Sequence, residues 1–141
     1  MKSAVLPALL LAAWVFDAMA SEPLFRADSK SLAGASPMDV VVREVERLPR
    51  ASVIEVDVTA RGSSVGASFF LMCSLRRLAQ QRGGYRYVVM LEERPKPEQM
   101  LVGFLRNAAD DPRTLGPAFQ GVPADKVVDL EQAAPICEQT K

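Results

Sequence analysis

Residues 53–91, VIEVDVTARGSSVGASFFLMCSLRRLAQQRGGYRYVVML, hold the pattern that decides the fold. At their start Ile54, Val56 and Val58 alternate with charged or polar side chains over residues 53–59. Strict alternation is typical of a strand that has one face on the core and one face in water. We therefore predict a half-buried strand at this point of the chain.

A helix and a second strand follow within the same stretch. Residues 65–81 carry apolar side chains at the i, i+3, i+4 and i+7 spacing of one helix face. These side chains are Leu71, Met72, Leu75, Leu78 and Ala79. Arg82-Gly83-Gly84 ends the helix, and residues 85–91 are apolar on both faces, as in an interior strand. The succession predicts a small α/β domain with a βαβ-like unit and a further helix, with α+β as the alternative class.

Residues 38–48, upstream of this unit, carry two conflicting patterns. Ser36 and Pro37 resemble the cap and first residue of a helix, and apolar side chains follow at helical spacing. Residues 40–42 are three β-branched valines, however, and side chains beyond them also alternate as in a strand. The helix is the preferred interpretation. The alternative is a strand that forms a hairpin through Pro49-Arg50.

The second half of the chain is rich in proline. Residues 97–108 predict an amphipathic helix, residues 110–124 an irregular loop, and residues 127–130 a short last strand. The side chains expected on the buried face of this second helix are Met100, Leu101, Phe104 and Leu105.

The N-terminal residues 1–20 have the three parts of a secretory signal peptide. Lys2 is a positive start, residues 4–16 are apolar apart from one proline, and Ala18-Met19-Ala20 is a small-x-small cleavage site. The apolar run is shorter than the roughly 20 residues that a membrane span needs. We therefore expect cleavage after Ala20, no lasting membrane span, and a periplasmic or secreted product.

The processed chain is expected to consist of a flexible leader, residues 21–35, and one domain, residues 36–141. Small and polar side chains dominate the leader. The remainder has the length of one small folded unit.

The sequence contains two cysteines, Cys73 and Cys137. An isolated pair in an exported protein most simply forms one disulfide, because the compartment is oxidising. Cys73 points away from the apolar face of the predicted helix. The bridge would therefore pin the C-terminal tail to the outer flank of that helix.

Composition excludes several functions. The chain has no histidine, so it can form neither a Ser-His-Asp triad nor a conventional zinc site, and we expect no metal and no cofactor. Its 17 basic and 17 acidic residues give a net charge of zero. A neutral chain argues against nucleic acid as the partner.

Residues 62–66, Gly-Ser-Ser-Val-Gly, match the G-x-S-x-G pattern between a strand and a helix. We weigh three interpretations for Ser63 and Ser64: a helix cap, an anion or contact site at the helix N-terminus, and a nucleophile at Ser64. Catalysis lacks the base that the motif needs, so no catalytic residue is assigned. The charged loop from Glu92 to Pro97 is a further candidate contact.

The stretch from Val53 to Glu92 resembles a module of small bacterial envelope proteins of unknown function. The resemblance lies in Leu75-Arg76-Arg77-Leu78-Ala79 and in Gly84-Tyr85-Arg86-Tyr87-Val88-Val89. It implies a bacterial periplasmic origin and carries no activity. We expect a non-catalytic module that binds another envelope or exported protein, in an accessory, inhibitor or immunity-like role. The alternative is a small histidine-free hydrolase or anion-binding protein that uses the Gly62–Gly66 turn.

Overall fold

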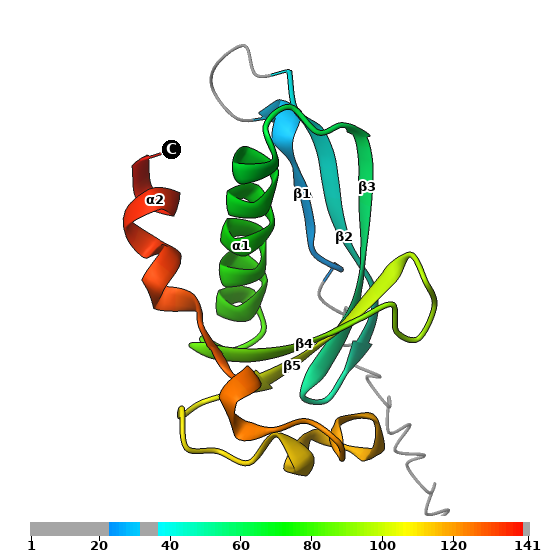
Figure 1. Ribbon diagram of the computed structural model, residues 1–141, viewed down its shortest axis with the longest axis vertical. Coiled ribbons are helices and arrows are strands. Elements are labelled where there is room, and N and C mark those ends of the chain that lie inside the picture. Colours follow the sequence, from blue (N-terminus) through cyan, green and yellow to red (C-terminus); the bar gives the residue numbers. More distant parts are fainter. Residues whose placement is uncertain (1–22, 32–36, 140–141) are drawn as a thin grey trace, which may run out of the picture.

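A curled antiparallel sheet organises the chain (Figure 1). The computed structural model describes residues 23–31 and 37–139, and in these residues six strands lie in the order β1-β2-β3-β5-β4-β6. The strands are β1 (Arg26–Asp28), β2 (Asp39–Leu48), β3 (Ala51–Ala60), β4 (Tyr87–Glu92), β5 (Gln99–Leu105) and β6 (Val128–Asp129). The helices are α1 (Ser64–Gln81) and α2 (Ala134–Gln139), which complete a mixed α/β domain.

The predicted strand, helix and strand of the central stretch are β3, α1 and β4. Both strands pair antiparallel with β5, which lies between them, so β3 and β4 run parallel without touching. The βαβ-like unit is therefore split by a strand from later in the chain. The predicted last strand is β6, which pairs with β4 and makes β4 an interior strand.

Residues 39–48 form strand β2, so the preferred helix over residues 38–48 is wrong and the strand alternative is confirmed. Val40, Val42 and Glu44 are buried at alternate positions, as the pleat of a strand requires. The chain then turns at Pro49-Arg50 and returns as β3. β-Branched side chains favour this pleated surface over a helix. The helix cap predicted at Ser36 lies outside the described residues.

The helix predicted over residues 97–108 is also wrong, because residues 99–105 form strand β5. Met100 and Val102 face the α1 side of the sheet, whereas Leu101 and Leu105 face the other side. A short apolar run that is buried on both faces has no periodicity that separates strand from helix. Residues 99–105 form a strand because they pair with β3 and β4.

The leader predicted as flexible over residues 21–35 contains an ordered strand. Residues 26–28 form β1 and pair with β2, and Phe25 and Ala27 are buried on either side of Arg26. Burial of these apolar side chains compensates the ordering of the backbone. The signal peptide predicted at residues 1–20 lies outside the described residues.

Two apolar clusters lie on opposite faces of the sheet. On one face α1 covers the sheet with the side chains that the sequence predicted, Leu75, Leu78 and Ala79 being fully buried. On the other face the loop of residues 106–127 places Leu115 and Phe119 close to Gly103 of β5. Gly103 permits this close approach, because a Cβ there would lie 2.6 Å from the Leu115 side chain.

Cys73 and Cys137 form the predicted disulfide, with 5.4 Å between their Cα atoms. The bridge joins α2 to α1, and α2 lies along the side of α1 in Figure 1. No side chain of α2 is buried, and the bridge ties this helix covalently to α1. No helix within residues 23–31 and 37–139 has the length and apolar character needed to span a bilayer.

Candidate functional site

The turn between β3 and α1 is a helix cap. Ser63 has an extended backbone, and its hydroxyl oxygen accepts a hydrogen bond of 3.0 Å from the amide of Gly66. Ser64 is the first residue of α1, and both serines are exposed. Capping satisfies one of the free amides at the start of the helix. The cap therefore accounts for the serine and glycine at this spacing.

Replacing Ser63 by alanine is expected to lower the free energy of unfolding by about 1 kcal/mol, the usual cost of losing a serine cap. Ser64→Ala is the matched control, and its expected change is only a few tenths of a kcal/mol, as at other exposed positions. Urea unfolding followed by circular dichroism measures both variants. Equal losses in the two variants would show that Ser63 does not cap the helix.

A group of apolar side chains on the α1 side of the sheet is only partly covered. We call this group the open flank; it consists of Val56, Val58, Met90 and Met100. Val56, Met90 and Met100 pack against the buried cluster beneath α1, yet each keeps part of its surface in solvent. Val58 is opposite the buried Val40 in the β2–β3 register and is 45% exposed. The open flank is thus an uncovered continuation of the core.

Strand β3 has an unpaired edge beside the open flank. Its register with β5 runs from Ala51 to Glu55 and stops where β5 begins at Gln99. Within the described part of the chain, residues 56–60 pair only with β2. We call the other side of residues 56–60 the free edge, and in Figure 1 this part of β3 forms the margin of the sheet. Its backbone amides and carbonyls remain available to another strand.

An acidic depression adjoins the open flank. Its volume is about 250 Å³. Its lining residues are Val56, Glu92, Glu93, Pro97, Glu98, Gln99 and Met100. Three of these side chains are carboxylates and none is basic, whereas Arg94 and Lys96 of the same loop do not line it. Glu92 is opposite Met100 in the β4–β5 register, so its carboxylate stands on the same face as the open flank.

The two contact sites that the sequence predicted thus have different roles in the structure. The loop from Glu92 to Pro97 borders the acidic depression, and Ser63 caps a helix. Sequence reasoning missed Val56 and Val58, because alternation marks them as core residues. Their exposure depends on where β5 begins, and no signal in the sequence of β3 carries that information.

The acidic side chains on the opposite face of β3 have basic partners. Arg43 lies 2.7 Å from a carboxylate oxygen of Glu55 and 3.0 Å from one of Asp57. Gln99 donates a further hydrogen bond of 2.9 Å to Glu55. These charges compensate one another across the strands, so they do not extend the acidic depression.

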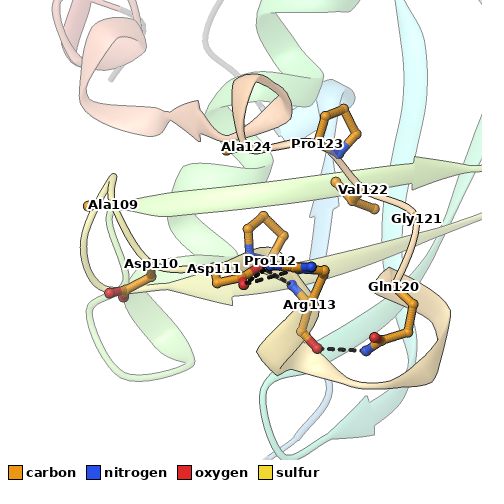
Figure 2. A pocket seen from close by; sticks show the side chains of 10 residues that line it. All are labelled: Ala109, Asp110, Asp111, Pro112, Arg113, Gln120, Gly121, Val122, Pro123 and Ala124. Atoms are coloured by element: carbon orange, nitrogen blue, oxygen red, sulfur yellow. Dashed lines mark hydrogen bonds and ion pairs between the residues drawn. The ribbon is translucent and has the colours of Figure 1, made fainter.

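A second depression, of about 610 Å³, lies within the loop of residues 106–127 (Figure 2). Figure 2 shows that Arg113 turns back on Asp111, to which it donates hydrogen bonds of 2.8–3.1 Å. These bonds lower the pKa of the Asp111 carboxyl and raise the pKa of Arg113. Gln120 donates to the carbonyl of Arg113. Asp111 and Arg113 are thus engaged with each other, and Asp110 accepts a hydrogen bond of 3.0 Å from the amide of Asn107.

Neither depression resembles a metal centre. Among the described residues no three cysteine, aspartate or glutamate side chains are grouped so that they could hold a metal ion. No family model matches the chain, and neither a curated protein nor a solved structure matches it.

Proposed function

We propose that the protein is a non-catalytic binding module of the bacterial periplasm, where it holds another envelope or exported protein on the open flank. An accessory, inhibitor or immunity-like role fits such a module. The observation that carries the proposal is the free edge of β3, five residues long, beside apolar side chains that include the exposed Val58.

Unpaired strand edges and exposed apolar groups promote association between chains. Natural proteins cover such edges, shorten them or place charges on them. Here Val56 and Val58 line an edge that no described element covers, while the opposite face of the same strand carries paired charges. A surface of this kind is favourable when a partner covers it.

The disulfide and the predicted signal peptide support the proposed compartment. A bridge between Cys73 and Cys137 is stable where thiols are oxidised, as they are in the periplasm. Residues 1–20 would direct the chain there.

Photo-crosslinking from position 58 tests the proposal. A benzoylphenylalanine in place of Val58 is expected to capture one discrete protein in living cells. The matched control carries the same group in place of Ala118, which is exposed on the loop that covers the opposite face of the sheet. Position 118 is expected to give no such product. Equal patterns from the two positions, or no product from position 58, would show that the open flank is not a binding surface.

A further inference from the structure

We infer that the partner contributes an extended segment with a basic C-terminal end, and that this segment adds to the free edge of β3 as an extra antiparallel strand. The inference rests on the proposed function and specifies what the open flank binds. It follows from three features: the length of the free edge, the side chains beside it, and the charge at one of its ends.

The free edge has the length of one ordinary strand. Residues 56–60 span about 17 Å at the usual rise per residue. Within the described part of the chain, no strand pairs with these residues on the side of β5. A segment placed there would pair with the backbone of β3 on the side that faces away from β2. Addition of a strand to an exposed sheet edge is a general mode of peptide recognition.

The open flank defines the side chains that the segment needs. Val56 and Val58 stand on the α1 side of β3, next to the position of the added strand. Alternate side chains of that strand would point to the same side. Apolar side chains at these alternate positions would cover Val58, and polar ones between them would face water on the side of Asp57.

The acidic depression indicates in which direction the added strand runs and which charge its end carries. Every described pair of neighbouring strands in the sheet is antiparallel, so the added strand would run in the direction of β5. Its C-terminal end would then reach Gln99 and the depression that contains Glu92, Glu93 and Glu98. These three carboxylates have no basic side chain beside them in that lining. A lysine or arginine at the C-terminal end of the segment complements them.

Selection from a random heptapeptide library tests the inference on the full chain. The protein serves as bait, and peptides that also bind the Val58→Lys variant are removed. We expect enriched peptides with apolar side chains at alternate positions and lysine or arginine toward the C-terminus. The inference would be overturned if no peptide is enriched, or if the enriched peptides are acidic or lack apolar side chains at alternate positions.

The best peptide then serves as the probe for the site. We expect slower amide hydrogen exchange within residues 56–60 when it binds, and at least tenfold weaker binding to Val58→Lys. Val65→Lys is the matched control, because Val65 is 63% exposed on α1 and lies outside the open flank. The double variant Glu92→Gln/Glu98→Gln, in which only exposed groups change, is expected to bind at least tenfold more weakly and with less dependence on salt.

Two outcomes separate this inference from the proposed function. If position 58 captures a protein but no peptide protects residues 56–60, strand addition is wrong and the binding surface stands. If residues 56–60 become protected without peptide as the protein concentration rises, the free edge binds a second copy of the chain, and the basic segment is wrong.

Discussion

Replacing Glu44 by glutamine is expected to lower the free energy of unfolding by about 3 kcal/mol, because a buried charge network loses its anion. Glu44 is only 3% exposed. Its carboxylate accepts hydrogen bonds of 2.9 and 2.7 Å from Arg47, 2.7 Å from the hydroxyl of Ser52 and 3.0 Å from the amide of Phe25. Nη1 of Arg82 lies 3.7 Å from the same carboxylate.

The network joins three elements of the fold. Arg82, which caps the C-terminal end of α1, also donates to the backbone carbonyls of Leu48, Pro49 and Ala51 in the β2–β3 hairpin. Glu44 holds this guanidinium and that of Arg47 at the end of the core. Removing one member of a buried ion pair costs about 3–5 kcal/mol, because the remaining charge loses its partner. Glutamine keeps the size of the side chain, so the loss of stability in Glu44→Gln measures the contribution of the negative charge.

The same carboxylate gives stability a pH dependence. Burial raises the pKa of Glu44, but hydrogen bonds from Arg47, the Phe25 amide and Ser52 outweigh burial and leave the pKa below its ordinary value. A lowered pKa in the folded state stabilises the fold above the unfolded pKa, about 4.3, and this contribution disappears as the pH falls through the folded value. The difference between wild type and Glu44→Gln should therefore shrink below about pH 4.

Urea unfolding at pH 7 and at pH 3 measures this difference. Glu46→Gln is the matched control, since Glu46 lies on the same strand and is exposed. We expect a change of less than 0.5 kcal/mol for this control. A Glu44→Gln loss equal to that of Glu46→Gln, or independent of pH, would contradict the role assigned to the buried carboxylate.

Replacing both cysteines by alanine is expected to lower the free energy of unfolding by about 4 kcal/mol. The bridge between Cys73 and Cys137 closes a sequence separation of 64 residues, and loop-closure entropy in the unfolded chain then gives a value of this size. In the folded state α2, which has no buried side chain, would keep only its non-covalent contacts. Arg76 supplies one of them, 3.7 Å from Glu138 of α2, and it also lies 3.3 Å from Glu131 in the turn just before α2.

Urea unfolding of the oxidised wild type, the reduced wild type and the Cys73→Ala/Cys137→Ala variant measures the contribution of the bridge. Reduction and double substitution should give the same loss within about 1 kcal/mol. We also expect faster hydrogen exchange in α2, whereas exchange in α1 should follow the global stability. If the Cys73→Ala/Cys137→Ala variant were as stable as the oxidised protein, the bridge would not stabilise the fold.

The sequence predicted the elements in which one pattern stands alone. Ile54, Val56 and Val58 alternate without competition, and β3 forms there. The apolar stripe around Leu75 and Leu78 has one period, and α1 forms there. The helices predicted over residues 38–48 and 97–108 are wrong because both segments fit a helical period as well as a strand. Pairing with other strands decides that both segments form strands.

The candidate site was less predictable than the fold. The loop from Glu92 to Pro97 stood out by its charge and proline content, and it does border the acidic depression. The free edge of β3 depends on a register between residues 51–55 and 99–103, which are far apart in the chain. Neither segment alone shows that β5 begins opposite Glu55.

The apparent size of the oxidised protein, extracted from the cells that make it, tests most directly whether the open flank binds a protein. We expect the wild type and Val65→Lys to elute in a complex larger than a single chain, and Val58→Lys to elute as a single chain. A wild type that elutes as a single chain, or a Val58→Lys variant that keeps the larger size, would contradict a binding surface at the free edge of β3.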